Sequence, residues 1–327
     1  MRARPRALRR AAALGLVAAL AIAGCGDDGG GEPAATDRWK PLPRSKLSRT
    51  EVAAARIGRA IYVAGGFEQA SGGKTVAAVL RYSIKSRSWK RVRSMPIGLN
   101  HAAAAAWRGR LYVVGGYSAP EGLATEEALL LRYDPKTNRW KRLAKPPSAR
   151  AALAAAVVGD RLYAVGGVRG GTALPTLEIY DLRKNRWTTG PDMAVAREHL
   201  AATATGGFVY VLAGRAGGQG NFAAAERFDT RTGKWERLPD MAKARGGNAA
   251  ATVRGDVVVF GGEESAGTIR EVERFDTATR TWSALPPMRT PRHGLGGAGL
   301  DGRVYSIEGG PEPGLFFSTD LEVLDVP

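Results

Sequence analysis

Five arginines recur in register along the chain, each close to the same distance before a glycine-rich site. Arg49, Arg150, Arg197 and Arg245 lie sixteen residues before the first residue of that site, and Arg292 lies seventeen before it. A guanidinium presents a planar fork of N–H donors that suits carboxylate, phosphate or sulfate groups. If the five side chains meet at one opening, they predict a site for an anionic ligand.

Two histidines stand two residues after this arginine position. The chain contains six copies of a repeated pattern of about fifty residues. His199 follows Arg197, and His101 follows Leu99, which stands in place of the arginine in the second copy. Glu51 has the same place in the first copy. His101 and His199 therefore join the five arginines as candidate ligand-binding residues.

A structural role for the arginines competes with ligand binding. Glu178, Glu226 and Glu273 stand two residues before a repeated aromatic residue, and Glu322 is equivalent in the last copy. If each Glu pairs with the Arg of the following copy, only Arg150 is unmatched. The arginines would then be struts between copies, and Arg150 would be the candidate free cation.

A repeat of about fifty residues positions these groups. Six tryptophans are spaced by 50, 51, 47, 48 and 47 residues, an aromatic residue stands seven residues before each of the last five, and double glycines recur in step. The tryptophans are Trp39, Trp89, Trp140, Trp187, Trp235 and Trp282, and the glycine sites are Gly65-Gly66, Gly115-Gly116, Gly166-Gly167, the altered Ala213-Gly214, Gly261-Gly262 and Gly309-Gly310.

This pattern, with runs such as IYVAGG and LYVVGG, resembles the kelch repeat. Six copies imply an all-β fold, a six-bladed kelch-type β-propeller over residues 38–327 with four antiparallel strands in each blade. In the second copy the expected strands are His101–Trp107, Arg110–Val114, Leu129–Tyr133 and Trp140–Leu143. The alanines in the first of these favour a helix by propensity, but small side chains also fit an innermost strand near the axis.

The two ends of the repeat region complement each other. The region opens with an outermost strand at Trp39–Leu42 and ends with a copy that lacks its Trp strand. We expect Trp39–Leu42 to pair with Leu321–Asp325, which closes the ring and removes an exposed sheet edge.

Loop lengths predict which face binds a ligand. From the glycine site to the aromatic residue the spacing is 17, 18, 14, 15 and 14 residues, whereas from the aromatic residue to its Trp it is always seven. The variable loops follow the second strand of each blade, so they emerge on one face. Variable loops on a rigid scaffold often carry function, and this face is the candidate binding face.

The first 24 residues have the pattern of a lipoprotein signal peptide. Residues 1–10 contain five arginines, residues 11–22 are apolar but too few to span a bilayer, and the run LAIAGC resembles the bacterial lipobox. The resemblance implies lipid on Cys25, a flexible tether over residues 25–37, and an extracytoplasmic protein anchored to a bacterial membrane. The alternative is an ordinary secretory signal that leaves Cys25 as a free thiol.

Composition excludes several function classes. The single Cys rules out a disulfide framework and a Cys-based zinc site, and with three His we expect no metal and no cofactor. The net charge is +17, and +12 without the five N-terminal arginines. The export signal argues against nucleic acid as a partner, so the charge favours solubility or attraction to anionic envelope polymers or lipid headgroups.

Signatures of enzymes are mostly missing, so we expect a binding or scaffolding module for a glycan or protein ligand, and a monomer. Glu126-Glu127 and Glu263-Glu264 lie in the variable loops, where adjacent acids are usually solvated. The chain also resembles bacterial periplasmic kelch proteins that interconvert sialic acid anomers, without matching a specific catalytic motif. A carbohydrate enzyme of that type and a purely structural envelope protein are the alternatives.

Overall fold

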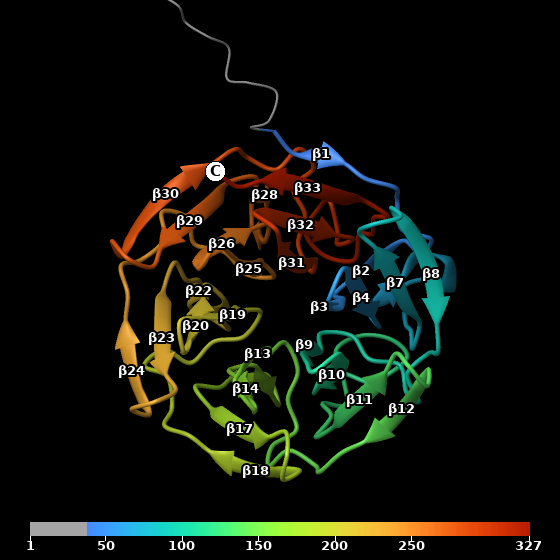
Figure 1. Ribbon diagram of the computed structural model, residues 1–327, viewed down its shortest axis with the longest axis horizontal. Helices are drawn as coiled ribbons and strands as arrows, with labels where there is room; N and C mark the ends of the chain where they lie inside the picture. The colour runs from blue at the N-terminus through green and yellow to red at the C-terminus, as the bar shows by residue number, and fades with distance from the viewer. Residues whose placement is uncertain (1–37) are drawn as a thin grey trace, which may run out of the picture. The chain divides into compact units, whose positions relative to one another are not determined.

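The chain forms six four-stranded antiparallel sheets arranged around a common centre, as Figure 1 shows for this computed structural model. The structure describes residues 38–327, so Cys25 and the predicted signal and tether lie outside it. From the centre outward, blade 1 has β3 (Ala53–Ile57), β4 (Ala60–Ala64), β7 (Val79–Ser83) and β8 (Ser88–Val92), and blade 2 has β9 (Ala103–Trp107), β10 (Arg110–Val114), β11 (Leu130–Asp134) and β12 (Arg139–Arg142). In the same order, blade 3 has β13 (Ala154–Val158), β14 (Arg161–Val165), β17 (Leu177–Asp181) and β18 (Arg186–Thr189), and blade 4 has β19 (Ala201–Thr205), β20 (Phe208–Leu212), β23 (Ala225–Asp229) and β24 (Lys234–Arg237). Blade 5 has β25 (Ala249–Val253), β26 (Asp256–Phe260), β29 (Val272–Asp276) and β30 (Thr281–Leu285), and blade 6 has β31 (Gly296–Leu300), β32 (Arg303–Ile307), β33 (Leu321–Asp325) and β1 (Lys40–Pro41). The all-β propeller prediction is confirmed.

The innermost strands consist largely of alanine and glycine because they converge on the axis. Strand β9 has the sequence AAAAW and β31 has GGAGL. A Cβ built on Gly299 would lie 2.1 Å from the carbonyl oxygen of Thr252 in the neighbouring blade, so no larger residue fits there. Close approach of the backbones therefore overrides the helix propensity of the alanine-rich segments.

The hydrophobic core lies between the blades rather than in one central mass. One buried cluster joins blades 1 and 2, and another joins blades 2 and 3. The last five repeat tryptophans link each blade to the preceding one. The indole N–H of each donates to a backbone carbonyl 43 to 47 residues earlier in the chain. Trp89, for example, donates to the Pro43 carbonyl at 2.8 Å.

The ring closes between the two ends of the repeat region. Strand β1 pairs antiparallel with β33, with Lys40 opposite Val323 and Pro41 opposite Glu322 (Figure 1). The Leu42 N–H also donates to the Leu321 carbonyl at 2.8 Å. The predicted pairing of Trp39–Leu42 with Leu321–Asp325 is confirmed.

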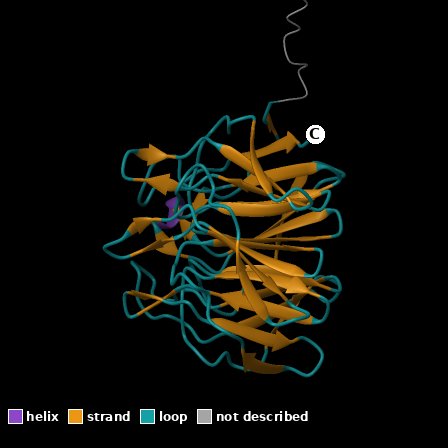
Figure 2. Cartoon of the chain, turned by 90° about the vertical axis from the view of Figure 1, so that its left-hand side faces the viewer, coloured by secondary structure: helices purple, strands orange, loops and turns teal. Residues whose placement is uncertain are grey.

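Short hairpins mark one face of the propeller, which we call the loop face. Figure 2 shows them at one side of the long blades, together with the 3-10 helix η1 (Gln69–Ser71). Their strands are β2 (Arg49–Thr50), β5 (Phe67–Glu68), β6 (Lys74–Thr75), β15 (Val168–Arg169), β16 (Thr172–Ala173), β21 (Arg215–Ala216), β22 (Gly220–Asn221), β27 (Glu263–Glu264) and β28 (Gly267–Thr268). Within residues 38–327, no helix has the length and apolar character needed to cross a membrane.

Candidate functional site

The five repeated arginines are buried and each is paired with a glutamate. Their side chains are 0–1% exposed, and the central channel is lined by other residues. Arg150, for example, donates to the carbonyls of Gly166 and Ala164 and to Glu178. The N···O distances of the pairs are 2.9 Å for Arg150–Glu178, 2.9 Å for Arg197–Glu226, 2.7 Å for Arg245–Glu273, 3.0 Å for Arg292–Glu322 and 2.8 Å for Arg49–Glu308.

These pairs correct the predicted partners. Four arginines pair with the glutamate of their own copy rather than that of a neighbouring copy, because the segment before the innermost strand packs beneath the third strand of the same blade. Arg150 is therefore not a free cation. Buried, neutralised guanidinium groups leave no surplus positive charge at the channel mouth, so the arrangement does not support an anion site made of arginines.

Blades 1 and 2 depart from this pairing, each in a different way. In blade 2, Leu99 and Leu131 replace both partners and are buried. In blade 1, Leu80 replaces the glutamate, and Arg49 pairs instead with Glu308 from blade 6. Glu308 stands where other copies have the first glycine, so the glycine site of the last copy is Glu308-Gly309 and not Gly309-Gly310.

The centre of the loop face is a ring of six equivalent residues. Five backbone hydrogen bonds join them in sequence around the axis, such as His101 N–H to the Glu51 carbonyl at 3.2 Å and Ala152 N–H to the His101 carbonyl at 2.8 Å. The Val52 N–H, next to Glu51, donates to the Gly294 carbonyl at 3.2 Å and closes the ring. All six have positive φ, namely Glu51 (53°), His101 (51°), Ala152 (49°), His199 (52°), Gly247 (68°) and Gly294 (58°). We call this set the central ring.

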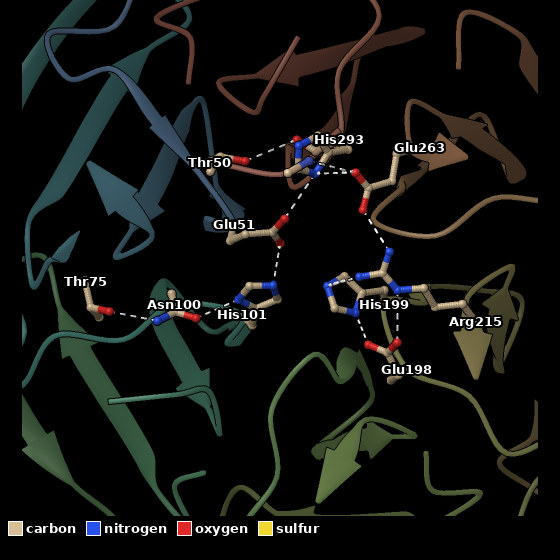
Figure 3. Close-up of polar contacts among 11 residues, drawn as sticks. Thr50, Glu51, Thr75, Asn100, His101, Glu198, His199, Arg215, Glu263 and His293 are labelled. Atoms are coloured by element: carbon tan, nitrogen blue, oxygen red, sulfur yellow. Dashed lines mark hydrogen bonds and ion pairs between the residues drawn. The ribbon is translucent and has the colours of Figure 1, made fainter. Parts of the chain in front are cut away.

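Three members of the central ring carry side chains with acid–base or ligating groups. A left-handed backbone favours glycine, which two blades use, so the glutamate and the two histidines occupy these positions at some cost in strain. Strain of this kind clusters at functional sites. Figure 3 shows that the side chains of Glu51, His101 and His199 lie close to one another, with His293 beside Glu51.

A chain of hydrogen bonds orients His101. The Thr75 hydroxyl donates to the Ala119 carbonyl at 2.7 Å, so its oxygen accepts from the Asn100 amide N–H at 2.8 Å. The Asn100 carbonyl oxygen must then face Nδ1 of His101, at 2.6 Å. Nδ1 therefore carries a proton, and Nε2 points at the Glu51 carboxylate at 3.2 Å.

His199 is oriented by a carboxylate and an arginine. Its Nδ1 contacts Glu198, and its Nε2 accepts from Arg215 at 3.1 Å. Arg215 also donates to Glu198 at 3.0 Å and to Glu263 at 2.8 Å (Figure 3). Glu263, expected to be a solvated loop residue, is instead buried and faces the centre.

Burial and neighbouring charges set the protonation of this cluster. Burial lowers the pKa of His101, although Glu51 opposes the shift, and burial together with His101 and Arg215 lowers the pKa of His199 much further. Burial would raise the pKa of Glu51, but His101 and His293 outweigh it and hold that pKa well below its usual value. These shifts favour the ionised form of Glu51 and the neutral forms of His101 and His199.

His293 is held between two carboxylates. Its Nδ1 lies 3.2 Å from Glu51 and 3.5 Å from Glu263, close enough for ion pairs but without the geometry of a hydrogen bond. Burial alone would lower the pKa of His293, but the contact with Glu51 outweighs it and raises that pKa. The two carboxylates therefore favour the protonated form of His293.

The cluster opens into the central channel, a cavity of about 140 Å³ whose walls are mainly alanine and glycine of the innermost strands. Of the predicted site residues, the structure brings together His101 and His199 here and leaves the five arginines inside the blades. Sequence reasoning missed Asn100, Glu198 and His293, which all occupy the repeat position just before the central ring. Comparing the copies at that position would have found them.

Comparison with known proteins agrees with the repeat pattern. A family model described as the KLHDC2/KLHL20/DRC7 Kelch-repeats domain matches residues 35–195, and the Kelch motif matches residues 196–242 and 244–289. Kelch-like protein terF of Aspergillus terreus is 34% identical over 143 residues, which are 40% of this chain and 31% of that protein. Kelch-like protein 35 of Mus musculus is 32% identical over 133 residues, 40% of this chain and 21% of that protein.

These alignments span less than a third of the length of either relative. The solved structure of YjhT has a TM-score of 0.75 with this chain at 17% identity, covering 86% of this chain and 95% of that one. A likeness at that identity shows the fold alone. With kelch repeats matched over most of residues 35–289 and the sheets arranged as a propeller, the chain belongs to the kelch-repeat family.

Proposed function

We propose that this propeller is an extracytoplasmic recognition module, anchored to a bacterial membrane through lipid on Cys25, that binds a protein partner with its loop face. The family supports this proposal because a propeller presents variable loops on a rigid scaffold. The observation that carries it is the exposure of three large apolar side chains on the loop face. The lipobox resemblance supports the location and the anchor.

Three large apolar side chains, which we call the apolar rim, are exposed on the loop face. Leu123, Leu315 and Phe316 are 58%, 53% and 44% exposed, and they lie in the β10–β11 and β32–β33 loops. The β4–β7 loop of blade 1 lies between these two loops and contacts both. Its Gly73 packs against Leu315, and its Thr75 N–H donates to the Pro120 carbonyl at 2.8 Å. Exposed apolar patches on soluble proteins often mark sites of protein–protein interaction.

Aspartate at the apolar rim is expected to weaken partner binding. The double variant Leu123→Asp/Phe316→Asp should retain at most a tenth of the wild-type capture of the partner from membrane extracts after crosslinking, because a charge would be buried at the interface. The matched control is Ala278→Asp, an exposed residue in a turn on the opposite face. Equal capture by wild type, rim variant and control would contradict the proposal.

A carbohydrate enzyme is a second candidate, favoured by one observation. The ionised Glu51 beside the neutral His101 and His199 places proton acceptors and donors at the channel mouth. Interconversion of sugar anomers requires removal of a proton from the anomeric hydroxyl and delivery of a proton to the ring oxygen. Exchange of sialic acid anomers above the buffer rate in NMR spectra, and lost in Glu51→Gln, would support this function over protein recognition alone.

The anchor can be tested at Cys25, which is the one cysteine of the chain. Cys25→Ser is expected to move the protein from the membrane fraction to the soluble fraction and to abolish incorporation of labelled fatty acid, because acyl chains bind membranes through buried methylenes. A wild-type protein without label, or a Cys25→Ser variant that stays lipid-labelled and membrane-bound, would contradict lipidation at this residue.

A further inference from the structure

We propose that Glu51, His101 and His199 form a binding site for a divalent transition metal ion of the Zn²⁺ type at the centre of the loop face. One carboxylate oxygen and one nitrogen from each imidazole lie within 4.8 Å of one another. The three residues come from three blades and from equivalent positions of the central ring. The site goes beyond partner recognition at the apolar rim and does not depend on it.

The arrangement of donors around His101 is that of a metal-ligating histidine. Such residues usually donate their second ring N–H to a carbonyl or carboxylate, which fixes the tautomer and the ring orientation. The chain Thr75, Asn100, His101 does this, since it places the proton on Nδ1 and leaves Nε2 directed at Glu51. His199 has the corresponding partner in Glu198, which contacts its Nδ1.

The contact between His101 and Glu51 has the separation expected of two ligands of one metal ion. Nε2 of His101 lies 3.2 Å from a carboxylate oxygen of Glu51. Ligands of a tetrahedral Zn²⁺ with bonds near 2.0–2.1 Å are separated by about 3.3 Å, so the two atoms stand at the distance that a shared Zn²⁺ requires.

Arg215 competes for His199 without blocking it. Its guanidinium makes one bond to Nε2 of His199 and two bonds to the carboxylates of Glu198 and Glu263. Metal binding at Nε2 requires release of the first bond only, while the two carboxylates continue to hold the side chain. Removal of this competing donor should therefore strengthen metal binding.

The charge and the donor types select the kind of ion. Three carboxylates, those of Glu51, Glu198 and Glu263, gather here around one guanidinium, that of Arg215, so the cluster favours a cation over an anion. Two imidazole nitrogens and one carboxylate oxygen suit Zn²⁺ and its neighbours, whereas Mg²⁺ and Ca²⁺ prefer oxygen ligands. Three protein ligands leave the fourth position open toward the channel.

Metal titration of the chelator-treated, purified protein tests the site. We expect saturable binding of one equivalent of ZnCl₂ by calorimetry, and visible absorption bands of bound CoCl₂ that report tetrahedral nitrogen and oxygen ligation. His101→Ala, His199→Ala and Glu51→Gln should each lower the affinity at least about 100-fold, and Asn100→Ala about 10–100-fold through loss of ring orientation. Glu121→Gln, an exposed carboxylate on the same face, is the matched control and should bind as wild type does.

Two further measurements separate a metal site from a structural cluster. Arg215→Gln should bind Zn²⁺ more tightly than wild type. Zn²⁺ should also raise the melting temperature of wild type, but it should not raise that of His101→Ala, which is expected to fold without metal. Absence of saturable binding by wild type would overturn the proposal. So would equal Zn²⁺ affinity of wild type and the triple variant Glu51→Gln/His101→Ala/His199→Ala, or NMR spectra in which Nε2 of His101 stays protonated with and without Zn²⁺.

Discussion

Glu308→Gly is expected to destabilise the propeller by about 3–5 kcal/mol, although it restores the residue type that the repeat usually has there. Glu308 and Arg49 are both fully buried, and the carboxylate accepts two hydrogen bonds from the guanidinium, at 2.8 and 3.0 Å. Without Glu308, Arg49 would keep its bonds to the Gly65 and Ala78 carbonyls but would lose its only counter-charge in the pairings described for residues 38–327. An uncompensated buried charge is among the most costly defects in a protein.

Equilibrium unfolding in urea measures this effect, and Ala213→Gly is its matched control. Ala213 stands at the equivalent position of blade 4 with φ of 58°, close to the 54° of Glu308. Because it pairs with no charge, its replacement should change the free energy of unfolding by no more than about 1 kcal/mol. Equal stabilities of Glu308→Gly and Ala213→Gly would show that Arg49 does not depend on Glu308.

A second substitution should recover the stability that Glu308→Gly loses. Leu80 is opposite Val63, as Glu178 is opposite Ala164 in blade 3, so Leu80→Glu places a carboxylate where the other blades have theirs. In the Glu308→Gly background it should restore most of the lost free energy by pairing with Arg49 inside blade 1. If the double variant is less stable than Glu308→Gly alone, the pairs are not interchangeable between blades.

The repeat explains why the fold could be predicted and why parts of the site could not. Trp, aromatic and glycine positions recur because every blade needs the same packing, so the blade strands and the closure by Trp39–Leu42 follow from the sequence. The sequence places the glycine site of the last copy one residue too late, because Gly309-Gly310 has the residue types of the motif. Glu308 occupies the first position instead, where it adopts the left-handed backbone conformation and forms a buried ion pair with Arg49.

The functional cluster is harder to predict because it consists of departures from the repeat. Glu51, His101 and His199 were visible at one repeat position, but their convergence depends on the left-handed backbone of the central ring. Arg215 and Glu263 come from hairpins of the loop face, where the copies differ in length and residue type. A repeat pattern identifies the packing positions that the copies share, whereas the residues of this cluster occur in one or two copies only.

Trp39→Ala is expected to cost about 3–5 kcal/mol and, beyond that, to loosen the closure of the ring. The Trp39 ring is buried against Phe260, with 5.7 Å between ring centroids, and its indole N–H donates to the Pro286 carbonyl at 3.1 Å. It precedes β1, which supplies just two paired residues to the edge of blade 6. Loss of this anchor should free β1 and expose the edge of β33.

Trp282→Ala separates the effect on closure from the effect of losing a tryptophan. Trp282 packs on Phe275 and donates to the Pro239 carbonyl at 2.8 Å, but its strand β30 is continuous with the rest of blade 5. Hydrogen exchange of the β33 amides should therefore accelerate at least tenfold in Trp39→Ala and stay near wild type in Trp282→Ala, because local opening exposes β33 only when β1 detaches. Equal rates of hydrogen exchange at the β33 amides in the two variants would mean that ring closure does not depend on Trp39. It would then depend on the contacts of residues 42–50 with blade 6, such as the hydrogen bond from the Ser45 N–H to the Thr319 carbonyl at 2.7 Å.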